Sequence, residues 1–139
     1  MEPLLERAGK RAMSVVAAVA LSLTGCGRGE PTGIDAERAR GAELYQLHCV
    51  ACHGGPEGGE ISDIPPRHNA QGHTWHHADC ELIDIVRDGL PRRPGQPEMP
   101  AFGEQLSDEE IRSILSHLET WWEPDQRAHQ EQVTDDLCR

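Results

Sequence analysis

The pentapeptide Cys49-Val50-Ala51-Cys52-His53 decides how this chain of 139 residues folds. Two residues separate its cysteines and a histidine follows directly, which is the spacing of a c-type haem attachment motif. In that arrangement the two thiols bond to the two vinyl groups of one haem, and the adjacent imidazole is offered to the iron. Two cysteines at this spacing also occur in redox dithiols and as one half of a zinc site.

The rest of the sequence favours haem over these two alternatives. A thioredoxin-like dithiol lies near a strand–helix unit, and no stretch of this chain alternates convincingly as a strand. A structural zinc site needs a second pair of ligands, and Cys80 and Cys138 are too scattered to form a recognisable pair. We therefore expect one covalently bound haem c. Such a group also supplies apolar volume to a chain with only 4% aromatic residues.

The first 25 residues are typical of an export signal. Three basic residues precede the apolar run 12–23, which is too short to span a bilayer comfortably. The run ends in Leu23-Thr24-Gly25-Cys26, which resembles a bacterial lipobox. Residues 1–25 are thus predicted to be a lipoprotein signal peptide, and Cys26 to be the lipidated N-terminus that holds the protein to a membrane. The alternative is an ordinary signal peptide with an incidental cysteine.

Export agrees with the haem motif, because bacteria attach haem to such motifs outside the cytoplasm. The predicted location is the periplasmic side of a bacterial membrane. Gly27 after the lipidated cysteine favours the outer membrane, by analogy with lipoprotein sorting.

The predicted domain organisation is a flexible tether over 26–33, a folded domain over 34–122 and a polar, loosely ordered tail over 123–139. Apolar residues recur with helical spacing in three segments, which are 34–49, 79–87 and 107–122. Residues 54–69 and 91–100 are predicted loops rich in glycine and proline. The fold class is therefore all-α, with three to four helices around the haem.

Three residues predict where these helices begin and end. Asp35 is placed to cap the first helix, and Gly89 follows the second as a stop signal. Ser107 has a glutamate three residues later, which is the signature of a capping box at the start of the last helix.

The spacing of Gly41, Tyr45 and Cys49 resembles that of class I c-type cytochromes, which carry a single haem. The resemblance implies the cytochrome c-like fold, in which this glycine lets the first helix cross the last one closely. It also implies that the aromatic residue packs at the crossing, where Leu118 and Trp121 would be its partners.

The same resemblance implies that Met99 is the second axial ligand of the iron, opposite His53. Met99 is the only methionine after the predicted signal peptide, and it lies in a proline-containing loop before the last helix. A thioether opposite a histidine raises the haem potential, which suits electron transfer. The alternative is a methionine that fills a gap in the core.

Histidines also cluster around Trp75. This cluster suggests three further hypotheses, namely a histidine as sixth ligand, a zinc or copper site, or hydrogen bonds from Trp75 and His76 to a haem propionate. Its histidines are His68, His73, His76 and His77.

A backbone carbonyl is expected to orient His53 through its second ring nitrogen. The resemblance assigns that carbonyl to Pro65, twelve residues after the histidine. Arg67 departs from the family pattern, which often has an apolar residue near the ring at that position.

Cys80 and Cys138 are expected to form a disulfide, since both would be exported into an oxidising compartment. This bond would tie the C-terminal tail to the middle helix.

The chain is acidic, with a formal charge of −11. This charge disfavours nucleic acid and favours a redox partner with a basic docking patch, although it also serves solubility alone. The predicted function is one-electron transfer to respiratory partners, not enzymatic catalysis. Two alternatives stay open, which are a haem enzyme with a labile sixth site, peroxidase-like or gas-binding, and a haem-bearing lipoprotein subunit of a larger respiratory complex.

Overall fold

The computed structural model describes residues 32–58, 65–95 and 98–139. The predicted signal peptide, the lipidation site Cys26 and most of the predicted tether lie outside these ranges.

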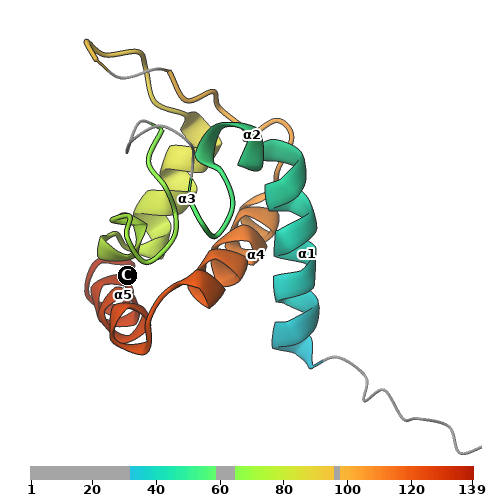
Figure 1. Ribbon diagram of the computed structural model, residues 1–139, viewed down its shortest axis with the longest axis vertical. Coiled ribbons are helices and arrows are strands. Elements are labelled where there is room, and N and C mark those ends of the chain that lie inside the picture. The colour runs from blue at the N-terminus through green and yellow to red at the C-terminus, as the bar shows by residue number, and fades with distance from the viewer. Residues whose placement is uncertain (1–31, 59–64, 96–97) are drawn as a thin grey trace, which may run out of the picture.

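The regular elements in the described part of the chain are helices, joined by loops, and this part contains no sheet (Figure 1). This confirms the all-α fold class, although there are five α-helices where three to four were expected. None of the described helices is long and apolar enough to cross a bilayer. The elements are α1 (Gly33–His48), α2 (Val50–His53), the 3₁₀ turn η1 (Thr74–His76), α3 (Asp79–Asp88), α4 (Asp108–Leu118), the 3₁₀ turn η2 (Glu119–Trp121) and α5 (Pro124–Leu137).

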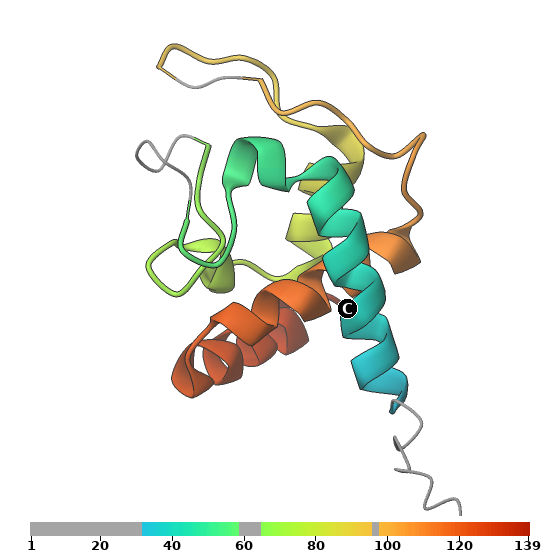
Figure 2. The same ribbon diagram turned by 45° about the vertical axis from the view of Figure 1, so that its right-hand side comes forward.

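Helices α1 and α4 form the largest contact in the fold and cross side by side in both ribbon views (Figures 1 and 2). A Cβ atom on Gly41 would lie 1.8 Å from the carbonyl oxygen of Ser113, so only glycine allows the two backbones to approach this closely. Four residues on, the Tyr45 ring meets the edge of Trp121, with centroids 5.1 Å apart. Both contacts confirm the expected role of Gly41 and Tyr45 at the crossing.

The hydrophobic core lies between these two helices and α3. Leu118 is 2% exposed and belongs to it, as expected. Its buried members are Leu44, Tyr45, Leu82, Ile83, Leu106, Ile111, Ile114, Leu115, Leu118 and Trp122.

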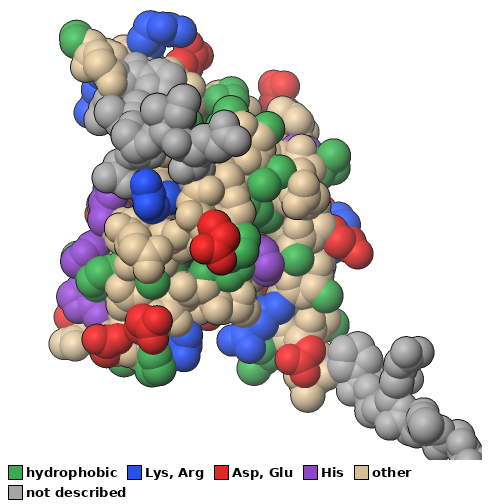
Figure 3. Space-filling model, in the orientation of Figure 1, with side chains coloured by type: hydrophobic (Ala, Val, Ile, Leu, Met, Phe, Trp, Pro, Cys, Tyr) green, Lys and Arg blue, Asp and Glu red, His purple; other side chains and the backbone are tan. Residues whose placement is uncertain are grey.

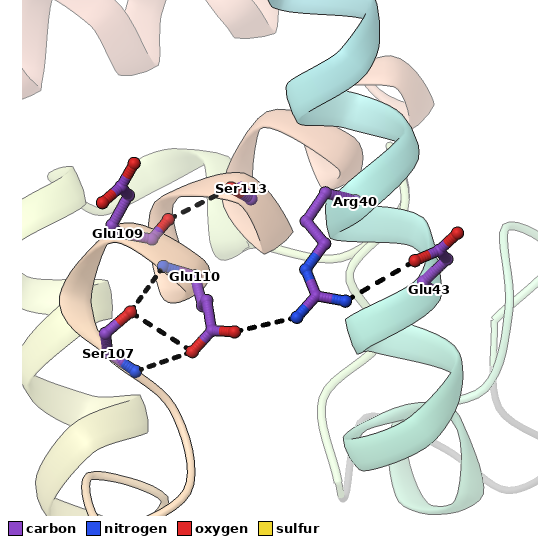
Figure 4. Close-up of polar contacts among 6 residues, drawn as sticks. All are labelled: Arg40, Glu43, Ser107, Glu109, Glu110 and Ser113. Carbon is purple, nitrogen blue, oxygen red and sulfur yellow. Dashed lines mark hydrogen bonds and ion pairs between the residues drawn. The ribbon is translucent and has the colours of Figure 1, made fainter.

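The helix ends are set by capping side chains. Ser107 and Glu110 form the predicted capping box, in which the Ser107 hydroxyl accepts from the Glu110 N–H and the Glu110 carboxylate accepts from the Ser107 N–H (Figure 4). The cap of α1 differs from the prediction. The side chain of Thr32, not Asp35, accepts the free N–H, and the N–H of Asp35 is its donor.

The C-terminal segment is helix α5, which corrects the expectation of a loosely ordered tail. The sequence of α5 has no apolar stripe that would predict a packed helix, because this helix docks through polar side chains instead. Gln130 is 4% exposed and donates to the Asp79 carboxylate at the start of α3. The Thr134 hydroxyl accepts from the Asp79 N–H at 3.0 Å. Helix α5 therefore caps α3, and the two helices lie together in Figure 1.

A disulfide joins Cys80 of α3 to Cys138 at the end of α5, with Cα atoms 5.7 Å apart. This distance is within the normal range for a bridge.

Candidate haem-binding site

The Cys49–His53 motif forms a single helical turn directly after α1. The carbonyl of Cys49 accepts from the N–H groups of Cys52 and His53, at 3.1 and 3.0 Å. Gly54 ends the turn at a φ of +74°, a conformation that favours glycine. The Tyr45 hydroxyl donates to the Gly54 carbonyl at 2.8 Å, so the end of the turn is tied back to α1.

Both cysteines of the turn are unpaired, whereas Cys80 and Cys138 are bonded to each other. Cys49 packs against the core and Cys52 is exposed. Burial raises the pKa of the Cys49 thiol to about 11, with a further contribution from Cys52. Redox dithiols depend on a lowered thiol pKa, so the environment of Cys49 disfavours that alternative.

His53 is 8% exposed, and its Nδ1 lies 2.7 Å from the carbonyl oxygen of Pro66. A carbonyl only accepts, so Nδ1 carries the proton and Nε2 keeps a lone pair for a metal. Burial lowers the pKa of His53, and the bond to Pro66 acts in the opposite direction.

The acceptor for His53 is therefore Pro66, and the prediction of Pro65 was wrong. The two prolines are adjacent. Residue counting cannot choose between them, because only the fold shows which of the two carbonyls reaches the ring.

His68 stacks on His53, with ring centroids 4.3 Å apart and an interplanar angle of 28°. Its Nδ1 lies 2.8 Å from the Thr74 hydroxyl, and Thr74 is buried. Burial lowers the pKa of His68 to about 3, with smaller contributions from His53 and His73. The His68 ring is therefore neutral at any physiological pH.

This stacking disfavours His68 as the sixth ligand. Two axial ligands approach the iron from opposite faces along one line, so their rings cannot lie face to face on each other. In the conformation described, His53 and His68 do lie face to face.

Met99 has its backbone fixed beside the end of α3. Its N–H and carbonyl exchange hydrogen bonds with Leu90, at 3.0 and 2.9 Å. Gly89, predicted as the stop of the second helix, follows α3 at a φ of +72°. A Cβ atom on Gly89 would lie 2.6 Å from the Met99 carbonyl oxygen. Ligation of the iron by Met99 stays a prediction.

The other histidines of the cluster lie along one edge of the molecule, where the segment before α3 meets α5 (Figure 3). Trp75 stacks on His76 with centroids 3.6 Å apart, and His129 of α5 meets the edges of both rings. The described residues contain no group of three or more metal-binding side chains arranged to hold an ion. The indole N–H of Trp75 already donates to the Gly72 carbonyl, which weighs against its proposed bond to a propionate.

Sequence reasoning missed the residues that hold the segment carrying Pro66 and His68. The indole N–H of Trp122 donates to the His68 carbonyl at 2.8 Å. Gln126 of α5 donates to the Ala70 carbonyl at 3.0 Å. Both contacts join residues more than 50 positions apart, so no local sequence pattern predicts them.

The residues of this site fit a covalently bound haem. Two unpaired thiols stand on one turn, and the histidine that follows has one nitrogen bonded to a carbonyl and the other available for a metal. That division is how proteins orient a metal-binding imidazole.

Comparison with known proteins gives a family model for subunit III of cbb3-type cytochrome c oxidase, which matches residues 36–118. The matched region runs from α1 to the end of α4, so it includes the Cys49–His53 turn and Met99 and leaves out α5.

Individual relatives include two proteins named cytochrome c6. That of Thermostichus vulcanus is 30% identical over 112 residues, which are 78% of this chain and 89% of the relative. That of Thermosynechococcus vestitus is 28% identical over the same shares. The cytochrome c subunit of gluconate 2-dehydrogenase from Pantoea cypripedii is 31% identical over 59% of this chain, but the match covers only 20% of that protein. No solved structure matches significantly.

Proposed function

Because the chain belongs to the cytochrome c family, we propose that it is an extracytoplasmic electron carrier with one covalently attached haem c. The observation that carries this proposal is the turn at Cys49–His53, where two unpaired thiols stand beside an imidazole whose Nδ1 is bonded to a carbonyl.

Cys49 and Cys52 would hold the haem, and His53 and Met99 would ligate its iron. When bound, the haem supplies a one-electron couple, and a methionine opposite the histidine raises its potential. Both axial positions would then be filled by the chain's own residues. That leaves no open site for a substrate and favours a carrier over an enzyme.

Lipid on Cys26 would confine the carrier to a membrane surface and raise its effective concentration near membrane-bound partners. The charge of −11 favours a partner with a basic docking patch. We propose that the carrier and its partner lie on the periplasmic side of a bacterial membrane.

The test is the absorption spectrum of the full chain, made in a bacterium with its c-type haem maturation machinery. We expect a reversible reduced and oxidised haem spectrum, and haem that stays with the chain on a denaturing gel. The double variant C49A/C52A should lose the covalent haem, and C80A/C138A should keep it. A wild-type chain that matures without haem would contradict the proposal.

A second candidate function is that of a haem-bearing subunit within a larger respiratory complex. It is favoured by the match to subunit III of an oxidase and by the similarity to a dehydrogenase subunit. Extraction in mild detergent distinguishes the two, because a subunit should co-purify with its complex in fixed stoichiometry. A free carrier should elute alone.

A further inference from the structure

The structure places His68 against the histidine that is proposed to bind the iron. The two rings are stacked at 4.3 Å. His68 also makes an edge contact with the Tyr45 ring, with centroids 6.0 Å apart. His68 therefore contacts both His53 and a residue of the α1–α4 crossing.

His68 is itself fixed at two points. Its ring nitrogen Nδ1 lies 2.8 Å from the hydroxyl of Thr74. Its backbone carbonyl accepts from the indole of Trp122, which is 4% exposed and belongs to the core. The ring can neither turn nor withdraw without breaking one of these bonds, so it presents a fixed surface to His53.

His53 needs such a surface because only one ring orientation keeps its own hydrogen bond. Its Nδ1 points at the Pro66 carbonyl at 2.7 Å, and rotation about the ring bond would break that contact. Hydrogen bonding at the second nitrogen makes an imidazole a more basic ligand. A more basic ligand stabilises Fe(III) relative to Fe(II).

We propose that His68 is a positioning residue for the axial ligand, holding the His53 ring in the plane that keeps its bond to Pro66. This inference rests on the proposed haem function. It predicts that loss of the stack loosens His53, weakens the bond to Pro66 and raises the haem potential.

The test is a redox titration of the haem-loaded protein, with proton NMR of the oxidised form to report the orientation of the axial imidazole. In His68→Leu we expect the ratio of reduced to oxidised haem at a fixed solution potential to rise by about threefold or more. This corresponds to roughly 28 mV for a one-electron couple. The haem methyl resonances should shift at the same time.

Three further variants separate positioning from packing. His68→Phe keeps a flat ring against His53 and should restore most of the wild-type ratio. Thr74→Val removes only the bond to Nδ1 and should shift the ratio in the same direction as His68→Leu, by less. Gln71→Ala changes an exposed side chain of the same segment and should change neither the ratio nor the resonances.

An unchanged ratio with unchanged resonances in haem-loaded His68→Leu would overturn the proposal and leave His68 a packing residue. If His68→Leu does not mature, Thr74→Val decides, and an unchanged ratio there overturns the proposal equally. A wild-type chain without a haem spectrum would instead overturn the proposed function, and this inference with it.

Discussion

Gly41 of α1 lies directly against the carbonyl oxygen of Ser113 in α4, so close that a Cβ atom would meet this oxygen at 1.8 Å. The obstacle is backbone within a helix and not the end of a flexible side chain. The crossing of α1 and α4 cannot widen locally without moving the core residues between them.

Gly41→Ala should therefore destabilise the fold despite the higher helix propensity of alanine. Overpacking of this kind costs about 1–3 kcal/mol, and occasionally more. For Gly41→Ala we expect a loss at the upper end of this range, measured as the decrease in the free energy of unfolding in urea. Gly33→Ala is the matched control, because nothing lies within 4 Å of its added Cβ, and it should be neutral or slightly stabilising. A Gly41→Ala variant as stable as wild type would contradict the described crossing.

The haem-attachment turn and the capping box could be predicted because their signals are local, whereas the α1–α4 crossing was predicted from the resemblance to class I c-type cytochromes. Gly41 and Tyr45 are four residues apart and so share one helix face. Ser107 and Glu110 belong to one capping box. In the turn and the capping box, the interacting residues lie within one or two helical turns, so their spacing predicts the geometry. Gly41 instead meets Ser113 of a distant helix, which local spacing does not indicate.

The support of His53 could not be predicted in the same way. Pro65 and Pro66 are equivalent by composition, and only the fold shows that the carbonyl of Pro66 reaches the ring. Helix α5 was missed for a related reason. Its stability comes from tertiary contacts such as those of Gln130 and Thr134 with α3, and tertiary contacts supply most helix stability in proteins.

Removal of the Cys80–Cys138 disulfide should loosen α5 and lower stability. The bond spans 58 residues, and the loop-closure entropy for such a loop corresponds to about 4 kcal/mol. We expect the double variant C80A/C138A to lose about 2–4 kcal/mol in urea unfolding of the haem-loaded protein. A thiol reductant should bring wild type to the same level and leave the double variant unchanged. Equal stability of wild type and variant would show that α5 docks without the bond.

The ion pair between Arg40 and Glu110 joins α1 to α4 at 2.9 Å (Figure 4). Both side chains reach solvent, so the pair itself contributes little. Arg40→Ala should lower the melting temperature less than Glu110→Ala, because Glu110 also accepts from the Ser107 N–H. The hydrogen bond from the Ser107 N–H and the one from Arg40 lower the pKa of the Glu110 carboxyl. The contribution of the Glu110 carboxylate to stability is therefore present at neutral pH and is lost as the pH falls through that lowered pKa. The difference between wild type and Glu110→Ala in thermal melts should accordingly shrink in acid.

Glu119 should show the opposite dependence on pH. Burial raises the pKa of its carboxyl, and the neighbouring Asp79 raises it further. The folded state therefore favours the neutral form, so the favourable contribution is complete below the usual carboxyl pKa and is lost as pH rises through the raised value. Glu119→Gln should melt higher than wild type at pH 7, by on the order of 1 °C because the group is partly exposed. The two curves should merge near pH 4 and below. Glu104→Gln, at an exposed turn, removes one surface carboxylate as well and is the control for that change of charge.

Met99→Ala tests the proposed sixth ligand without disturbing the hydrogen bonds that its backbone makes with Leu90. Loss of a thioether opposite His53 should lower the potential, by on the order of 0.1 V given the range that axial ligands span. It should also open the iron, so the reduced variant should bind carbon monoxide rapidly and stoichiometrically while wild type resists it. Met13→Ala, within the predicted signal peptide, should leave the potential of the mature protein unchanged. If wild type binds carbon monoxide as readily as Met99→Ala, its sixth site is open or labile. The hypothesis of a haem enzyme or gas-binding protein would then replace that of an electron carrier.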